Sequence, residues 1–197
     1  FIDLEQRRID LAGEYQFDGW LERATGRLGY ANYEHTEFEA PGEPGTVFSN
    51  EGWEGRLELV NRAREFSGGQ VRGAQGFQFR LSDFAAIGEE AFIPPVETTQ
   101  YGVFALREYS TGPWRVDIGG RYEMTEHENS VAGISRDFNG FSVSGGVGYD
   151  VSEAVFLGVN VFRTERAPST TELFANGPHL ATNSFEIGDS ELDEETS

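Results

Sequence analysis

Apolar and charged residues alternate with a period of two along most of this sequence, and this pattern constrains the fold more than any other feature. In residues 8–17, Ile9 and Leu11 would share one face, and Asp10 and Glu14 the other. Successive side chains of a strand point to opposite faces of a sheet, so the pattern predicts a strand with one apolar and one charged face. It recurs in residues 22–35, 53–62, 71–81, 99–109, 114–124, 141–149 and 155–161, which predicts about eight strands.

The connections between these strands alternate between short and long. Short turns are predicted at residues 18–19, 67–69, 110–113 and 150–152, and long loops at residues 35–52, 83–98, 125–139 and 167–197. This organisation predicts an all-β fold, an antiparallel up-and-down meander. Outer-membrane barrels combine short periplasmic turns with long extracellular loops. A soluble β-sandwich, or a small closed β-barrel with a passive or binding role, also needs one apolar face, so alternation alone leaves it open.

Composition narrows the class of protein further. Mean hydropathy is −0.46, and no apolar run is long enough for a membrane-spanning helix, whereas a membrane strand needs only every second residue to be apolar. The net charge of −19 argues against nucleic acid as a partner. The absence of cysteine excludes disulfides and thiolate ligands. Phe1 begins what reads as mature sequence, which predicts a processed or truncated exported protein.

The charged face predicts a hydrated interior. Its arginines alternate with Glu and Asp along the predicted strands, and this set is too polar to pack dry. Eight strands close into a barrel with little interior space. The sequence therefore favours part of a wider barrel. The arginines concerned are Arg23, Arg27, Arg56, Arg62, Arg72, Arg80, Arg115 and Arg121.

The C-terminal residues carry a family resemblance. Residues 166–173 fit the pattern R-x-P-S-x-x-E-L, which resembles a stretch of TonB-dependent receptor barrels. Residues 179–195 fit H-x-A-T-x-x-F-E-x-G-x-x-x-L-x-x-E, which resembles the zinc-type subgroup of these receptors. Upstream, Tyr33, His35 and Glu37 fit that subgroup's Y-x-H-x-E at the end of a strand. The resemblance covers essentially the whole chain.

This resemblance implies an outer-membrane receptor of a Gram-negative bacterium, with about 22 strands around a plug domain. It implies active uptake, most readily of zinc, through the TonB complex, which would act on the plug. Residues 1–197 would then be a fragment of the barrel domain without plug or closing strands. Residues 167–197 would be an extracellular loop leading to the next strand. The expected partners are the TonB complex, zinc or a metal complex, and outer-membrane lipid.

The resemblance also implies metal-binding residues. Glu37 and His179 match positions of barrel-side zinc ligands, and zinc binds imidazole nitrogen and carboxylate oxygen where thiolates are lacking. His35 lies two residues before Glu37, hence on the same strand face, and is a candidate third ligand. Zinc would be the transported ligand and not a cofactor, and no cofactor is predicted. His127, between Glu126 and Glu128, is interpreted as a solvated loop residue.

Other functions remain open at this stage. A siderophore or haem receptor is the alternative within active uptake, and a passive pore or structural barrel is the alternative outside it. An enzyme is not predicted. Ser169, Glu172 and His179 lie in one loop, but that loop has neither a nucleophile elbow nor a glycine-rich oxyanion signature.

Overall fold

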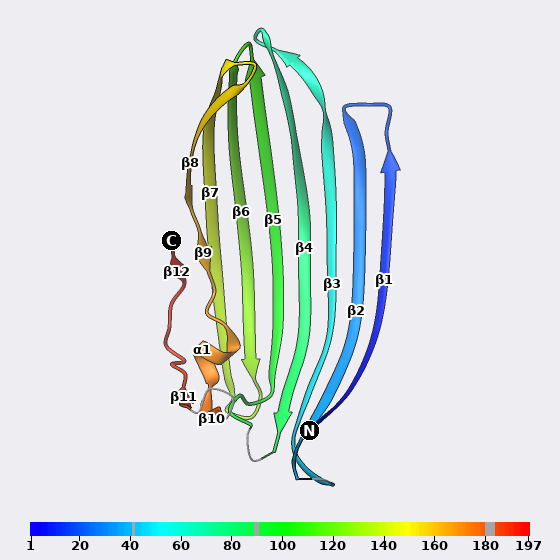
Figure 1. The fold of residues 1–197 in the computed structure, drawn as a ribbon, viewed down its shortest axis with the longest axis vertical. Coiled ribbons are helices and arrows are strands. Elements are labelled where there is room, and N and C mark those ends of the chain that lie inside the picture. Colours follow the sequence, from blue (N-terminus) through cyan, green and yellow to red (C-terminus); the bar gives the residue numbers. More distant parts are fainter. Residues whose placement is uncertain (41, 89–90, 180–183) are drawn as a thin grey trace.

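Eight strands in chain order form one antiparallel sheet (Figure 1). The computed structural model describes residues 1–40, 42–88, 91–179 and 184–197, without the side chains of Glu39 and His179. The strands are β1 (Ile2–Gln16), β2 (Leu21–Ala40), β3 (Glu43–Phe66), β4 (Gly69–Ile87), β5 (Val96–Thr111), β6 (Trp114–Asn129), β7 (Ile134–Ser152) and β8 (Val155–Arg163). Each strand pairs with the next along the chain, which confirms the predicted all-β meander.

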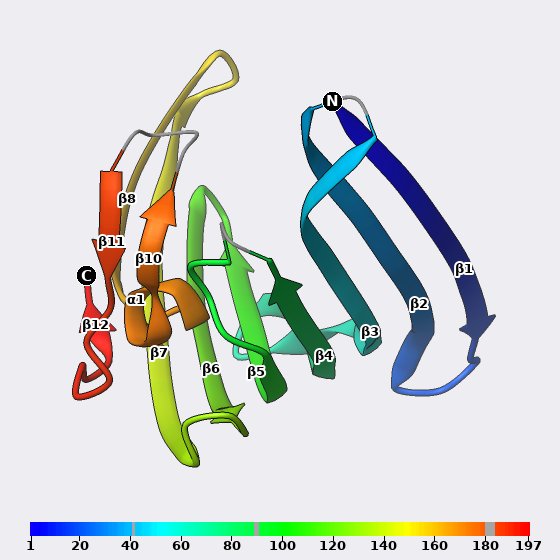
Figure 2. The same ribbon diagram turned by 90° about the horizontal axis from the view of Figure 1, so that it is seen from below.

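The sheet is curved and not closed. Its outer strands β1 and β8 are the two ends of the strand order and do not pair with each other. Figure 2 shows the strands as a curved open wall, with β1 and β8 on opposite sides of the view. This architecture is consistent with the prediction of a segment of a larger barrel.

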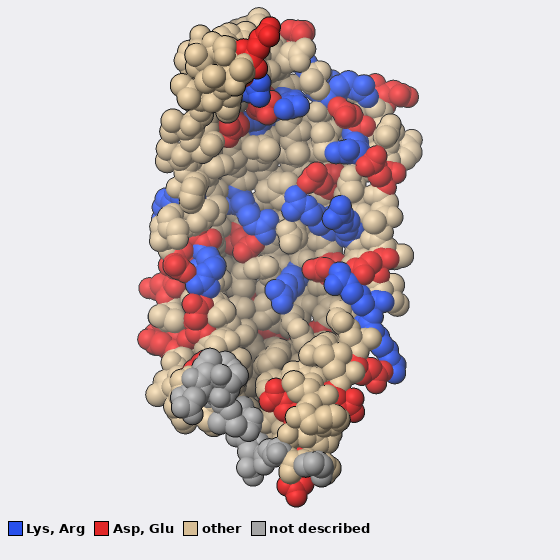
Figure 3. Space-filling model, in the orientation of Figure 1, with Lys and Arg blue, Asp and Glu red and all other residues tan. Residues whose placement is uncertain are grey.

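The two faces of the wall differ as the alternation predicted. Direct cross-strand partners share a face, and Leu11, Leu28 and Gly55 form one such row on what we call the apolar face. The opposite, polar face carries arginine and carboxylate side chains, which spread over the view in Figure 3. Exposed residues of the apolar face include Ile9, Leu11, Leu28, Leu57, Phe77, Leu81, Val103, Val116, Ile118, Phe141, Val143, Val147, Leu157, Val159 and Val161.

Aromatic residues form two rows on the apolar face. At the end with the short turns, the rings of Trp114 and Tyr149 are 4.6 Å apart, and Tyr15 and Tyr109 lie on the same face. At the other end, which we call the loop end, the ring of Tyr30 lies 4.8 Å from that of Trp53. Tyr101 and Tyr122 continue this second row. We call the residues between the rows the apolar band; paired aromatic rows of this kind flank the apolar belt of membrane barrels.

The strands extend further than the alternation predicted, and the connections after β2, β4 and β6 are shorter than the predicted loops at residues 35–52, 83–98 and 125–139. β2 and β3 continue to Ala40 and from Glu43, and β4 to β7 likewise run beyond their predicted ends. The reason is that the regular alternation of apolar and charged residues stops beyond the loop-end aromatic row, while the hydrogen-bond ladder continues. Four carboxylates are successive cross-strand partners there, namely Glu51, Asp83, Glu97 and Glu128.

The stretch predicted as loop, residues 167–197, contains short regular elements. These are α1 (Thr170–Phe174), β10 (Asn176–His179), β11 (Ser184–Ile187) and β12 (Glu195–Thr196), and β12 pairs with β9 (Glu165–Arg166). Leu173 and Phe174 of α1 join Val96 and Phe138 of the sheet in a small buried cluster. None of the helices within the described residues is long and apolar enough to span a membrane.

The β3–β4 turn offers a test of backbone strain. Ser67 and Gly68 have φ of 48° and 81°, a conformation that suits a two-residue hairpin turn. We expect Gly68→Val to lower the free energy of unfolding by about 1–2 kcal/mol, because a side chain disfavours positive φ. A Cβ on Gly68 or on Gly13 would meet nothing within 4 Å, so neither substitution creates a steric clash at Cβ. Gly13 lacks a positive φ, and Gly13→Ala is therefore the control for backbone strain. Denaturant titration of the intact protein in detergent measures both; equal losses would contradict this explanation.

Candidate functional site

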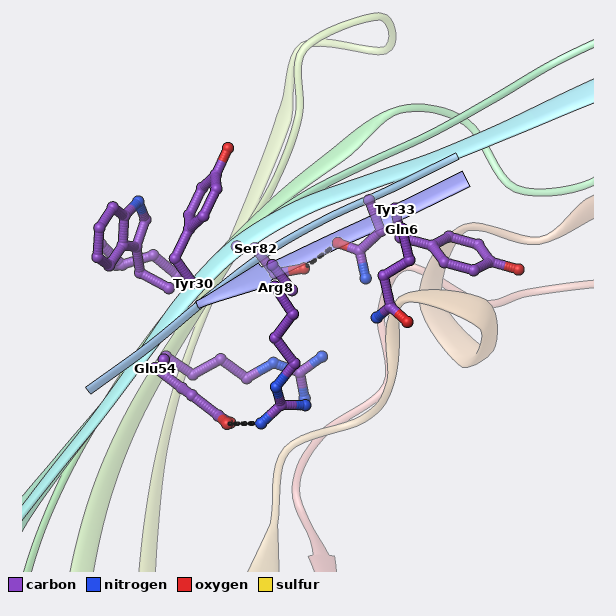
Figure 4. A pocket seen from close by; sticks show the side chains of 13 residues that line it. Gln6, Arg8, Tyr30, Tyr33, Glu54 and Ser82 are labelled. Carbon is purple, nitrogen blue, oxygen red and sulfur yellow. Dashed lines mark hydrogen bonds and ion pairs between the residues drawn. The ribbon is translucent and has the colours of Figure 1, made fainter. Parts of the chain in front are cut away.

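Two cavities lie on the polar face. The first has a volume of about 410 Å³ and is lined by residues of β1 to β4, including Gln6, Arg8 and Glu54. Figure 4 shows Arg8 reaching toward Glu54, with Tyr30 on the opposite side of the sheet. The Arg8 Nη2 to Glu54 Oε1 distance is 3.7 Å, and Arg8 also donates two hydrogen bonds to Asp10. Arg8 is therefore already compensated by two carboxylates.

The second cavity lies between the wall and the C-terminal segment (residues 164–179 and 184–197). Its volume is about 310 Å³, and its lining includes Thr125 and His127 of β6 and residues 166–170 of the segment. Asn50, Arg80 and Ser82 line both cavities, so the two adjoin. The Ser82 hydroxyl donates to Asn50 Oδ1 at 2.8 Å, a contact also drawn in Figure 4.

Most arginines of the polar face are paired with carboxylates. Arg72 donates two hydrogen bonds to Glu108, at 2.9 and 3.1 Å, and Arg56 donates to Glu58 at 2.8 Å. Arg115 pairs with Asp150, and Arg121 with Glu123. Exposed pairs of this kind contribute only about 0–1 kcal/mol each to stability. Because of these pairs, the polar face carries many charges but little local net charge. Such a surface is consistent with the predicted hydrated interior.

The structure brings two of the three predicted metal ligands together. His35 and Glu37 lie on the polar face of β2 near its loop end, with His35 Nε2 3.6 Å from Glu37 Oε1. The imidazole of His35 stacks on the ring of Phe48 at 4.6 Å, and its Nδ1 is buried without a hydrogen-bond partner. Glu37 is more exposed than His35. The described residues contain no group of three or more His, Asp or Glu side chains placed to hold a metal.

The third predicted ligand is not adjacent to this pair. His179 ends β10, where its backbone pairs with Ser184, and its side chain lies outside the described part of the chain, as do Ala181 and Thr182 of the motif. Figure 1 places β10 and the far end of β2 at the same end of the sheet. Figure 2 shows them on opposite sides of the curved wall. Joint binding by His179 and Glu37 stays a prediction.

His127 is not a solvated loop residue, and that interpretation is wrong. It belongs to β6 and is 5% exposed. Its Nδ1 lies 2.9 Å from Thr98 Oγ1, and its Nε2 lies 3.2 Å from the carbonyl oxygen of Pro168. The C-terminal segment covers it, and a contact between residues 41 positions apart in the sequence is not visible in local composition.

One arginine links three parts of the C-terminal segment. Arg166 donates to both carboxylate oxygens of Glu172, at 2.9 and 3.1 Å, and to Glu195 of β12 at 3.0 Å. Glu172 also accepts from the backbone N–H of Ser169, whose hydroxyl accepts from that of Glu172, so the two form a capping box. Hydrogen bonds from Arg166 and Ser169 lower the pKa of Glu172 to about 2.

Sequence reasoning missed α1 although a signal for it was present. Ser169 and Glu172 have the S-x-x-E spacing of a capping box. It also missed Arg107, which lies on the apolar face and not on the charged one. Its strand also places Phe104 and Leu106 on the polar face, so the alternation in β5 is too irregular to have assigned Arg107 to a face.

One comparison with known proteins identifies the chain. A family model described as TonB dependent receptor-like, beta-barrel, matches residues 1–197, which is the whole chain. The match agrees with the open antiparallel wall, with its one apolar and one charged face, and with the two aromatic rows.

The Arg166 contacts generate a pH-dependent prediction. Because the pKa of Glu172 is lowered from 4.5 to about 2, its ion pair stabilises the segment at pH above 4.5, and the effect is lost as the pH falls toward 2. We expect Arg166→Gln to increase hydrogen exchange in α1 at neutral pH and to remove most of this pH dependence. Arg7→Gln, which breaks an exposed pair with Glu5, is the control. Unchanged exchange in the Arg166 variant would show that the ion pairs of Arg166 do not stabilise α1.

Proposed function

Because the chain belongs to the TonB-dependent receptor β-barrel family, we propose that its receptor takes up zinc through a site to which His35, Glu37 and His179 contribute. Barrel domains of this family are outer-membrane proteins of Gram-negative bacteria, and they serve receptors and not enzymes. Uptake by the family depends on TonB. Zinc as the transported ligand, and contact with the TonB complex through a plug domain, are parts of the proposal.

The spacing of His35 and Glu37 is the observation that carries the zinc proposal. Zinc binds nitrogen and oxygen ligands at about 2.0–2.2 Å in tetrahedral geometry, which separates two ligand atoms by about 3.3–3.5 Å. The 3.6 Å between His35 Nε2 and Glu37 Oε1 is close to that separation. The stacking of His35 on Phe48 holds the imidazole in place. Tetrahedral zinc needs four ligands, so His179 and a group from the plug would complete the set.

Zinc titration of the intact receptor by calorimetry tests this proposal. We expect His35→Ala, Glu37→Ala and His179→Ala each to weaken zinc binding by about tenfold or more, since each removes one ligand. Glu34→Ala is the matched control, because it removes an exposed carboxylate from the opposite face of the same strand. Unchanged affinity in all three variants would refute the zinc assignment. Titration with haem and with a ferric siderophore would then decide between those ligands.

We also propose that the apolar face contacts outer-membrane lipid and that the polar face lines the barrel interior. Membrane barrels place apolar residues outward and polar residues inward. Spin labels at Leu57 and Phe77 should then be accessible to lipid-soluble oxygen, and labels at Arg56 and Arg80 to a water-soluble reagent. Arg56 and Leu57 are consecutive, so they differ in face and hardly in depth. The opposite accessibility would contradict this orientation.

A further inference from the structure

One arginine interrupts the apolar band. The cross-strand partners of Arg107 are Gly73 of β4 and Ile118 of β6, and both belong to the apolar face. It lies two residues before Tyr109 of the turn-end aromatic row, toward the loop end of β5. Arg163 of β8, the cross-strand partner of Val143, lies on the same face but is paired with Glu165 at 2.5 Å, so within the described part of the band Arg107 is the arginine without a carboxylate partner. A guanidinium on a lipid-facing surface is destabilising, so its presence requires a compensating partner.

The wall itself compensates the guanidinium only in part. Arg107 Nη1 donates to the carbonyl oxygens of Ala74 at 3.1 Å and of Leu106 at 2.7 Å. Its Nη2 donates to Gln75 Oε1 at 2.7 Å. Gln75 is the cross-strand partner of Ala105 and lies on the same apolar face. Within the described chain, Arg107 forms no ion pair with a carboxylate, and its positive charge is not neutralised.

The remaining groups at this position are all hydrogen-bond donors. A guanidinium has five N–H groups, and the three hydrogen bonds leave the one on Nε and one on Nη2. Gln75 accepts through Oε1, which leaves its amide nitrogen as a further donor. A cation surrounded by donors is suited to an oxyanion, and Nε and Nη2 can together bind two oxygens of one phosphate.

The surroundings leave room and add positive charge toward the turns. Gly73 has no side chain, and a Cβ there would lie 2.8 Å from Arg107 Cδ, so the arginine side chain lies across this glycine. Ala105, next to Gln75, is also small. Arg64 of β3 is exposed and is the cross-strand partner of Val71, one row nearer the turns. Within a membrane, the oxyanion that reaches such a position is the phosphate of a lipid headgroup.

The geometry points to a phospholipid site on the outer surface of the wall, in which Arg107 and Gln75 bind the headgroup phosphate and Arg64 attracts it from the periplasmic interface. The short turns of membrane barrels lie on the periplasmic side, so the lipid belongs to the periplasmic leaflet. Its acyl chains lie along the neighbouring apolar residues. This site is on the opposite face from His35 and Glu37 and does not depend on the identity of the transported ligand.

The test is a titration of the intact, detergent-solubilised receptor with phosphatidylglycerol, read as bound lipid by native mass spectrometry. We expect Arg107→Leu to weaken the tightest lipid binding by about tenfold, as loss of a charge-assisted hydrogen-bonded pair predicts. Arg107→Lys keeps the positive charge but lacks the paired Nε and Nη2 donors, so it should reduce lipid affinity less than Arg107→Leu does. Gln75→Leu should weaken binding in the same direction. Arg7→Leu, on the same face outside the apolar band, should leave it unchanged.

Two competitors identify the chemistry. Diacylglycerol, which has the acyl chains without phosphate, should not displace phosphatidylglycerol, and inorganic phosphate should not displace it either. Displacement by diacylglycerol, or wild-type lipid affinity in Arg107→Leu, would overturn the proposal. Either result would show that Arg107 lies on the apolar face without binding a headgroup. Displacement by inorganic phosphate would indicate a water-accessible anion site instead. A change of subunit number in Arg107→Leu at unchanged lipid affinity would indicate a protein carboxylate as the partner.

Discussion

The structure depends on the requirement that every backbone N–H and C=O group within a membrane has a partner in the protein. The antiparallel ladder meets this requirement for each strand that has a neighbour on both sides. Its register shifts lie at or beyond the edges of the apolar band. Three register shifts lie near the short turns, after Leu21 in β2, Asn61 in β3 and Asp150 in β7. Two more lie near the loop end of β2, after Thr36 and Phe38. Between them the pairing is unbroken, so irregular backbone is confined to positions where water can reach it.

A single ladder with two different faces explains the unusual composition. The sheet has little buried core of its own, because the apolar side chains face outward and the charged ones line the other side. Gly29 on the polar face shows how closely charges approach there: a Cβ on it would lie 3.2 Å from Asp10 Oδ1 and 3.3 Å from Glu54 Cγ. The polar face neutralises most of its arginines with carboxylates from within the chain. On the apolar face Arg163 is paired with Glu165, whereas Arg107 has only neutral partners within the described chain, and the inferred headgroup phosphate is the anion that would neutralise it.

Sequence reasoning predicted the strands where one face is apolar, since Leu11, Leu57 and Ile118 each alternate with charged neighbours. It failed at the strand ends beyond the loop-end aromatic row, where apolar and polar residues no longer alternate. The ladder there is formed by backbone atoms, so it continues without a periodic pattern of residue types. It placed His35 and Glu37 on one face correctly, because strand geometry fixes the relation of residues two positions apart. The burial of His127 could not be predicted, since it depends on a segment that returns to the wall from a distant part of the chain.

The C-terminal segment forms one side of a polar cavity on the wall. The cavity at Arg80 has the sheet on one side and residues 166–170 on the other, so its shape depends on how that segment is held. Leu173 and Phe174 pack on Val96 and Phe138, and the ion pairs of Arg166 add directed contacts within the segment. Arg136 and Asn139 of the wall also donate hydrogen bonds to Leu192 and Glu194. The packing is non-directional, whereas the guanidinium of Arg166 fixes α1 and β12 relative to β9 through directed hydrogen bonds. The same arginine lines the cavity, so the residue that positions the segment also borders the space that the segment encloses.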